Sequence, residues 1–327
     1  GKEKELTLVD VLGKDVTVNM PVKRIIAHDD SHGEPLRLLG AVDLVVGAGE
    51  NLVTHDILLP EMSKLPTIGG MRNVDSEKVI SLNPDLFITF GSWAPGLEEH
   101  VEPYGITVLR LDCMNPRTIS EDVKKLGYIL GEVDEAEEFV DFNNDILDKI
   151  KARTEGLSED EKPRVYIETL YYYRTCIKGV KHDDACIMAG GVNIAHDLIL
   201  PGAWPKIDPE WVITQNPDFI MGCTFKCGFG IEDRTEVEAV REEIMRRPEL
   251  ANVNAVKNGK VYITSNDIAF SGLQGFACVV YWAKWLHPDL FEDLDPQAIH
   301  QEYLDGFMRI DYDLDEHGPF VYPPLES

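Results

Sequence analysis

The sequence predicts an α/β protein of two lobes, each with a mostly parallel sheet flanked by helices, joined by a single long α-helix. Short apolar runs alternate with amphipathic segments, one uninterrupted helical stretch divides the chain, and a helix–strand unit occurs twice. Strands that alternate with helices are typical of a parallel sheet covered on both faces. With 327 residues, the chain is also longer than one ordinary core requires.

The first lobe is predicted to open with a hairpin, because Leu6–Val11 and Asp15–Val18 alternate around a glycine-containing turn. Short apolar runs then predict strands, and segments of helical spacing between them predict helices. The predicted strands are Ile25–Ala27, Leu44–Gly47, Leu65–Ile68, Leu86–Phe90 and Thr107–Leu111. The predicted helices are Gly33–Leu39, Ser76–Leu82, Gly96–Tyr104 and Thr118–Leu130, the last ended by Gly131.

The long helix is predicted over Asp134–Arg153, which has no glycine or proline, begins with acids and ends with bases, as the helix dipole favours. A polar break precedes a second alternating region. Its predicted strands are Arg164–Ile167, Phe219–Met221 and Val261–Thr264, and its late helices are Glu236–Arg246 and Gly272–Leu286. The predicted domains are therefore residues 1–131, a connecting helix at 132–156, and residues 157–327.

Composition narrows the class of protein. The net charge of −27 disfavours binding to nucleic acid, whose phosphates attract basic surfaces. No apolar run approaches the roughly 20 residues that span a bilayer. The spacings Cys176/Cys186 and Cys223/Cys227 permit a disulfide or a soft-metal site, although free thiols are the favoured interpretation.

The repeat is the most informative feature. Asp75–Asp85 recurs as Asp208–Asp218, with Asp, Glu, Val, Ile, Asn, Pro and Asp at matching offsets. In each copy the first Asp can cap a short helix, Asn-Pro ends it, and an apolar strand follows. Glu77 and Glu210 then occupy matching first turns, where an acid suits the helix dipole and a matched pair equally suits a symmetric docking surface.

Ordered motifs along nearly the whole chain resemble the binding proteins of ABC importers for iron–siderophores, haem and cobalamin. They are the opening Val9–Val18, Arg24–Ala27 with Glu34 and Gly40-Ala41, and later Ala189–Asn193, Ala255–Tyr262 and Leu286–Phe291. The resemblance implies two lobes joined by one long helix, a ligand between them, and a permease docked through Glu77 and Glu210. It also implies a location outside the cytoplasmic membrane, with a lipid tether upstream of residue 1, no enzymatic activity and no cofactor besides a bound metal chelate.

Ligands of open α/β sheets bind beyond the carboxyl ends of the strands, which selects the loops that follow them. The loop after the first strand contains His28, Asp30 and Ser31, and His28 with His32 could share a metal if both lay on a helix. The alternative, which we favour, is that Asp30 or Ser31 caps the next helix and the histidines are solvated. No matching ligand set occurs in the second lobe, so no metal ligands are assigned.

Further ligand contacts are predicted on both lobes. Met71 and Trp204 precede the two repeat copies at equivalent places, which carry aromatic residues in the cobalamin-binding relatives. Trp204 also fits an ordinary core position. The other candidates are Arg72, Trp93, Tyr172, Tyr173, Arg174, Lys226, Asp267 and Phe270, of which one or two tyrosines are expected to be structural. The cations favour an anionic ligand.

Other functions stay open from the sequence alone. The nucleophile elbow, the phosphate loop and the HExxH zinc motif are absent. Chelatase-like enzymes nevertheless share this architecture, and fold alone does not exclude catalysis. A receptor that signals instead of delivering its ligand is a further alternative. Within the binding class, a bare metal ion or an oxyanion such as molybdate competes with a chelate.

Overall fold

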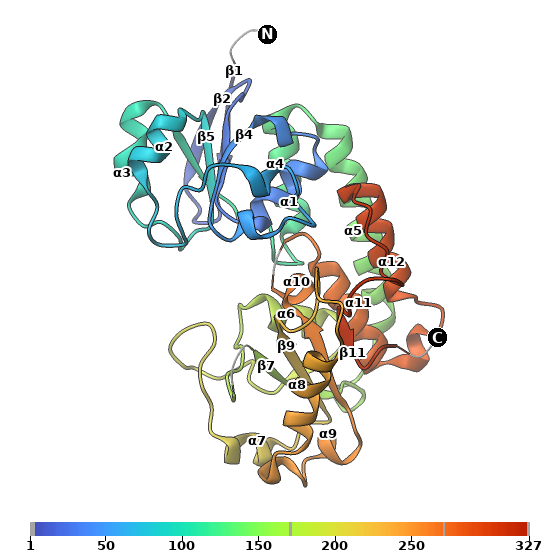
Figure 1. Cartoon of the computed structure of the whole chain (residues 1–327). Coiled ribbons are helices and arrows are strands. Elements are labelled where there is room, and N and C mark those ends of the chain that lie inside the picture. Colours follow the sequence, from blue (N-terminus) through green and yellow to red (C-terminus); the bar gives the residue numbers. More distant parts are fainter. Residues whose placement is uncertain (1–3, 170–171, 271, 326–327) are drawn as a thin grey trace. The chain divides into compact units, whose positions relative to one another are not determined.

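The structure, a computed structural model, describes residues 4–169, 172–270 and 272–325. The chain divides into two compact units, Gly1–Asn143 with Gly306–Ile310, and Asn144–Asp305 with Asp311–Ser327. The boundary falls inside helix α5 (Val133–Thr154), which has Asp134 and Glu135 in its first turn and Lys151 and Arg153 in its last. The predicted long helix is therefore present, with one residue added at each end (Figure 1).

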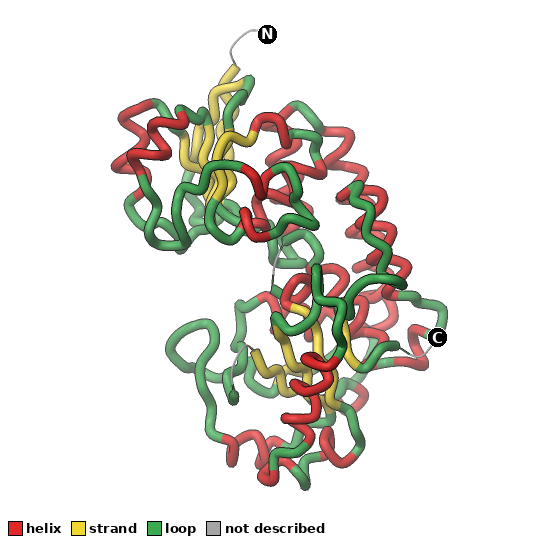
Figure 2. The backbone as a smooth tube through the Cα atoms, in the orientation of Figure 1, coloured by secondary structure: helices red, strands yellow, loops and turns green. Residues whose placement is uncertain are grey.

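The first unit contains a hairpin and a parallel sheet. The hairpin pairs β1 (Lys4–Val9) with β2 (Asp15–Met20). The sheet has the order β4-β3-β5-β6, and all its pairs are parallel. Figure 2 shows the strands in yellow among the red helices. Its strands are β3 (Ile25–Ala27), β4 (Val45–Ala48), β5 (Leu86–Thr89) and β6 (Thr107–Arg110).

Helices cover this sheet on both faces. Helices α2 (Ser76–Leu82) and α3 (Leu97–Val101) pack on one face, where Val79, Phe87 and Val101 share a buried cluster (Figure 1). Helices α1 (Asp30–Leu38) and α4 (Ile119–Leu130) cover the other face. Burial of both faces explains why the strands are continuous apolar runs rather than alternating ones.

One prediction for this unit needs correction. Leu65–Ile68 is not a strand: only Thr67 forms a bridge, to Ala48, because Pro66 has no N–H to donate to a ladder. The contacts also group Gly306–Ile310, from late in the chain, with this unit. Arg37 holds this returning segment, donating from Nε to the Met308 carbonyl oxygen at 2.6 Å.

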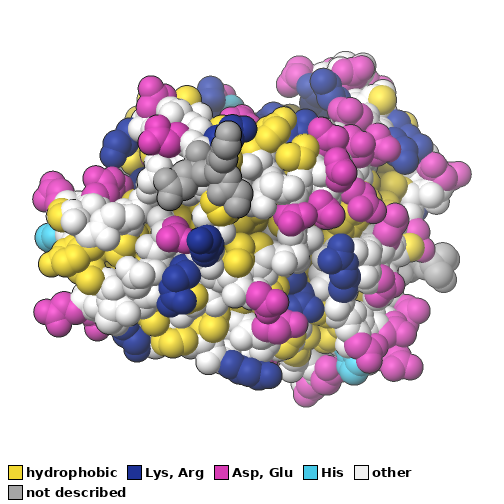
Figure 3. Space-filling view, turned by 90° about the horizontal axis from the view of Figure 1, so that it is seen from above, with side chains coloured by type: hydrophobic (Ala, Val, Ile, Leu, Met, Phe, Trp, Pro, Cys, Tyr) yellow, Lys and Arg dark blue, Asp and Glu magenta, His cyan; other side chains and the backbone are white. Residues whose placement is uncertain are grey.

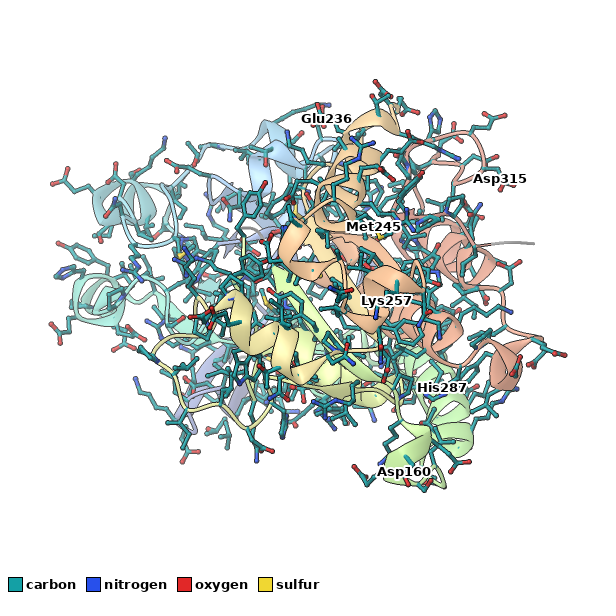
Figure 4. All side chains as sticks on the ribbon, turned by 90° about the horizontal axis from the view of Figure 1, so that it is seen from below. Asp160, Glu236, Met245, Lys257, His287 and Asp315 are labelled. Carbon is teal, nitrogen blue, oxygen red and sulfur yellow. The ribbon has the colours of Figure 1, made fainter. Side chains whose placement is uncertain are left out.

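The second unit has a five-stranded sheet of order β11-β10-β9-β7-β8, parallel except for the edge strand β11 (Val321–Tyr322). The other strands are β7 (Arg164–Thr169), β8 (Val192–Asn193), β9 (Phe219–Thr224) and β10 (Val261–Ser265). Helices α7 (Pro209–Gln215), α8 (Thr235–Met245) and α9 (Asn254–Lys257) lie on one face. Figure 4 labels Glu236 and Met245 on α8 and Lys257 on α9.

The opposite face is covered by α6 (Lys181–Met188) and α11 (Gly275–Leu286), with α10 (Asn266–Ala269) and α12 (Pro296–Tyr303) beside them. Helix α11 is buried almost all around, as its largely apolar sequence requires. It ends before His287, whose ring is 3.0 Å from the Gly190 carbonyl oxygen (Figure 4).

A buried ion pair crosses the second unit. Arg247 donates two hydrogen bonds to Glu168 on β7, at 2.6 and 2.7 Å, and two more to Glu243. Burial acts to lower the pKa of Arg247, but the hydrogen bonds to these carboxylates outweigh it and raise that pKa. Glu168 also accepts from the Tyr166 hydroxyl and the Tyr173 N–H, so one carboxylate joins the strand to the loop that follows it.

The repeat forms the same connection between a short helix and the sheet in both units, and we call this connection, made by the Asn-Pro-Asp segment, the joint. Asp75 and Asp208 cap α2 and α7 with their side chains, as predicted. Both helices end in a left-handed asparagine, Asn83 (φ 47°) and Asn216 (φ 45°), a conformation that asparagine tolerates better than most residues. The Asp after each Asn-Pro then accepts N–H groups at the start of a strand of the parallel sheet: Asp85 from Lys23 and Arg24, which directly precede β3, and Asp218 from Arg164, the first residue of β7.

Replacing Glu168 with Ala is expected to lower the free energy of unfolding by about 3 kcal/mol, because it leaves the buried Arg247 guanidinium without its main partner. Urea unfolding followed by circular dichroism measures the change. Glu159→Ala, which removes the exposed pair with Lys162, is the control and should leave the midpoint unchanged. Equal midpoints for both variants would contradict a structural role of the buried pair.

Candidate functional site

The loop after β3 places His28 at the carboxyl edge of the first sheet. The ring is buried, with Nδ1 at 2.7 Å from Thr89 Oγ1 and Nε2 at 3.2 Å from the Gly70 carbonyl oxygen. Because a carbonyl oxygen only accepts, Nε2 carries the proton and Nδ1 accepts from the threonine. Burial lowers the pKa of His28, so the ring is neutral and both nitrogens are engaged.

The cap of α1 differs from the prediction. Asp29, rather than Asp30 or Ser31, caps the helix and accepts from the Ser31 N–H and hydroxyl. Asn51 also donates to Asp29, and although burial acts to raise the pKa of this carboxyl, hydrogen bonds and the neighbouring His32 hold it below its ordinary value. A carboxylate at the start of a helix matches the positive end of the dipole.

The histidines are not solvated, contrary to the prediction. His32 is fully buried in α1, 3.2 Å from the Leu111 carbonyl oxygen and with its ring 4.4 Å from that of Phe90. Burial lowers its pKa to about 4. Phe90, the first residue after β5, thus packs on the first turn of α1. Within the described ranges, no three His, Cys, Asp or Glu side chains gather to hold a metal ion.

An aromatic group closes this edge of the first unit. The Trp93 ring packs edge-on against the rings of His28 and Phe90, with ring centroids 5.2 Å and 4.7 Å apart. The Ala94 N–H donates to the Met71 carbonyl oxygen, and this bond joins the loop after β5 to the segment before α2. A bridge between Gly69 and Val74 forms a tight turn with Met71 and Arg72 exposed at its tip. The structure thus brings His28, Met71, Arg72 and Trp93 together, as neighbours on one edge.

The corresponding edge of the second unit has a ring cluster around Phe270. The Trp204 ring lies 5.4 Å from it and the Phe225 ring 6.4 Å. The Lys181 ammonium lies 3.9 Å from the Phe270 ring centroid, within the range of a cation–π contact. The Trp204 indole N–H is buried and has no hydrogen-bond partner among the described residues. Rings, a cation and a donor therefore meet where the strands end.

The predicted tyrosine segment separates into structural and exposed parts. Tyr173 belongs to the core, and its hydroxyl donates to Glu249 at 2.7 Å, so we remove it from the ligand contacts. Tyr172 is exposed, and the Arg247 guanidinium lies over its ring. Arg174 is exposed and donates to the Trp204 carbonyl oxygen at 2.8 Å, which places its charge beside the ring cluster. Leu170 and Tyr171 lie outside the described residues.

Two other candidates have structural partners. Lys226 pairs with Glu236 at 2.8 Å on the surface, so its charge is already balanced. Asp267 accepts from the Phe229 N–H at 2.7 Å and so holds the loop after β9. Both contacts account for these residues without a ligand.

Sequence reasoning missed Lys181 and His182. They form the first turn of α6, which follows β7 just as α1 follows β3, and this matching position was the available signal. His182 is fully buried, with neither ring nitrogen partnered in the described part of the chain, and burial lowers its pKa to about 3. Nothing in the sequence distinguished this histidine from a solvated one.

The six cysteines are all free and buried. Burial raises the pKa of each thiol, for example to about 12 for Cys227. They are therefore protonated core residues. Glu77 and Glu210, by contrast, are exposed in the first turns of α2 and α7.

Each unit thus has a mostly parallel sheet with aromatic and charged side chains at its carboxyl edge, the edge at which open α/β sheets bind ligands. A model of the periplasmic binding protein family matches residues 25–268. The chain belongs to this family, whose members bind solutes outside the cytoplasm and are not enzymes. None of the described helices combines the length and hydropathy of a membrane span.

Several known proteins are similar to the chain. The ABC transporter substrate-binding lipoprotein YvrC of Bacillus subtilis is 27% identical, over 88% of this chain and 87% of the relative. A cobalamin-binding protein of Halobacterium salinarum is 23% identical (81% and 67% covered), and the petrobactin-binding protein YclQ of B. subtilis is 23% identical (83% and 84%).

Solved structures share the fold. The TroA-like periplasmic binding protein FepB of Veillonella parvula superposes with a TM-score of 0.81 at 22% identity, covering 97% of this chain and 99% of that one. The molybdate-binding protein MolA of Haemophilus influenzae gives a TM-score of 0.78 at 18% identity (94% and 99%).

The buried His182 should make the second unit sensitive to acid. Its folded pKa of about 3 lies below the ordinary 6.5, so its contribution to stability is complete above pH 6.5 and is lost as pH falls toward 3. The free energy of unfolding of His182→Leu, relative to that of the wild type, should therefore rise by about 2 kcal/mol from pH 7 to pH 4.5. Urea unfolding at the two pH values measures this change. His100→Leu, on the exposed part of α3, is the control. If the difference in stability between His182→Leu and the wild type were the same at both pH values, the His182 ring would ionise as freely in the folded protein as in the unfolded chain.

Proposed function

We propose that the protein captures a metal chelate such as an iron–siderophore, haem or cobalamin and delivers it to the permease of an ABC importer. The observation that carries this proposal is the cluster of Lys181, Trp204, Phe225 and Phe270 in the second unit. Such a cluster suits a ligand that is large, flat in part, and negatively charged.

The aromatic residues favour a large ligand. Stacked and edge-on rings contribute area and geometry that a bare ion cannot use. In the first unit, Trp93 and the exposed Met71 offer further apolar surface, and methionine adapts its shape to an irregular partner. For a bare metal ion, His28 would have to give up one of its two present hydrogen bonds, because a ligating ring nitrogen cannot also bond Thr89 or Gly70.

The charges favour an anionic ligand. Acidic side chains gather over the face shown in Figure 3, as expected for a net charge of −27. At the carboxyl edges, however, Lys181 and Arg174 lie beside the second ring cluster, and Arg72 lies at the tip of the turn in the first unit. Cations placed locally in an acidic protein attract carboxylate or catecholate oxygens and exclude cationic solutes.

The names of the relatives support this proposal without choosing between ligands. Cobalamin and petrobactin are both large, and molybdate is small.

A thermal-shift panel of haemin, a ferric tris-catecholate, cyanocobalamin, molybdate and Ni²⁺ tests which kind of ligand the protein binds. A chelate present at about 100 times its dissociation constant adds roughly 2.7 kcal/mol of stability. A shift with molybdate or Ni²⁺ alone would overturn the chelate assignment, and no shift with any compound would count against solute capture of this kind.

Phe270→Ala should weaken the affinity for the chelate about tenfold, because it removes the ring that Trp204, Phe225 and Lys181 share. Isothermal titration with the compound selected by the panel measures the loss. Tyr128→Ala on the outer side of α4 removes an exposed ring and should leave affinity unchanged. Equal affinities for the two variants would place the ligand elsewhere.

Glu77 and Glu210 are proposed to dock onto the permease. Each lies in the first turn of a short helix that the Asn-Pro-Asp joint fixes to its own sheet, and each is exposed. A carboxylate held in this way can make a bidentate, charge-assisted contact with an arginine.

The double variant Glu77→Ala plus Glu210→Ala should lose transport in cells while the purified protein keeps its affinity for the chelate. Uptake assays and titration measure the two properties. Glu99→Ala plus Glu302→Ala is the matched control, with one exposed helical carboxylate removed from each unit. Normal uptake by the first double variant would exclude docking through this pair.

A further inference from the structure

An exposed apolar loop precedes the docking helix of the second unit. Residues 197–203 form no helix or strand, and Ile199 is 99% exposed. Leu200 and the next three residues are exposed as well. A single exposed apolar side chain is ordinary, but a consecutive group at a loop tip indicates an interaction surface.

Both ends of this loop are held firmly. At its start, His196 pairs with the buried Asp183 at 2.9 Å, and the His196 carbonyl oxygen accepts from Lys178 N–H. At its end, the segment around Pro205 pairs with the residues after β7, through Arg174 and Lys206 and through the Thr175 N–H. The tip is therefore presented on a fixed base, which lowers the entropy lost when it binds.

The first unit has no such loop. There the chain enters α2 through the tight turn between Gly69 and Val74, which exposes Met71 and the cation Arg72. The repeat thus matches from Asp75 and Asp208 onward and diverges immediately before them. Because the loop continues through Lys206 and Ile207 into α7, the apolar tip and Glu210 belong to one connected segment of the second unit.

We propose that the tip formed by Ile199 and Leu200 inserts into an apolar recess of the permease beside the residue that receives Glu210. This inference rests on the proposed docking through the two carboxylates and extends it to an apolar contact. Carboxylate pairing supplies attraction and orientation, whereas burial of shape-matched apolar side chains at the centre of an interface discriminates one partner from another.

The charges around the tip favour this occupant. Asp197, Asp208 and Glu210 are all exposed near it along the chain. These acids repel an anionic lipid surface. They also repel a second copy of the same chain, because a two-fold contact places each patch against itself. A protein that is basic as well as apolar, such as a permease that binds the two glutamates, complements both properties.

The test compares binding to the detergent-solubilised cognate permease complex by surface plasmon resonance. Ile199→Ser plus Leu200→Ser should weaken binding at least about tenfold and leave chelate affinity and thermal stability unchanged. The matched control, Tyr104→Ser plus Tyr128→Ser, removes two exposed aromatic side chains from the first unit and should bind normally. Glu77→Ala plus Glu210→Ala serves as the positive control.

The outcomes separate the two proposals. Normal permease binding by the loop variant, with weakened binding by the glutamate variant, would overturn the loop inference and leave the proposed function intact. An equal loss of chelate affinity in the loop variant would assign the tip to the ligand and overturn the inference. Binding of the wild type, but not the loop variant, to phosphatidylcholine–phosphatidylglycerol vesicles would assign it to lipid. Failure of the wild type to bind the permease would remove both proposals.

Discussion

A carboxylate that accepts the first N–H groups of a strand is the constraint on which both units depend. Asp85 holds Lys23 and Arg24, and Asp218 holds Arg164, so each short helix ends at a fixed distance from the start of its sheet. Arg24 and Arg164 complete the joint by donating to the carbonyl groups at the ends of α2 and α7. The start of each sheet therefore also positions the short helix, α2 or α7, that carries Glu77 or Glu210.

Because of this constraint, the two ends of each sheet differ in what their residues contact. The joint occupies the amino ends of the strands, and the proposed ligand contacts lie at the opposite, carboxyl ends. Buried, neutral side chains whose hydrogen bonds are all made within the protein hold that edge in place. His28, bonded to Thr89 and Gly70, is an example. The side chains that we propose to bind the ligand are thus held by groups that do not bind it, which keeps the surface preorganised before a ligand arrives.

Most of the architecture could be predicted from the sequence, because the repeat and the strand–helix alternation depend on local chemistry. Asp75 and Asp208 cap their helices as expected, and the long helix begins and ends within one residue of its predicted bounds. Predictions failed where tertiary burial decides. His32 and Tyr173 look polar or amphipathic in sequence, yet their surroundings place them in the interior. Lys181 was missed because the only signal for it, the matching places of α6 after β7 and α1 after β3, lies outside the repeated sequence.

The burial of all six thiols has a practical consequence. A protonated, enclosed thiol does not react with alkylating or oxidising reagents, so the native chain should be silent toward them and become reactive only where it opens. The cysteines are distributed over both units, with Cys113 in the first and the other five in the second. The protein therefore carries built-in reporters of local opening in each half, and a cysteine introduced on its surface would be the only one to take a label.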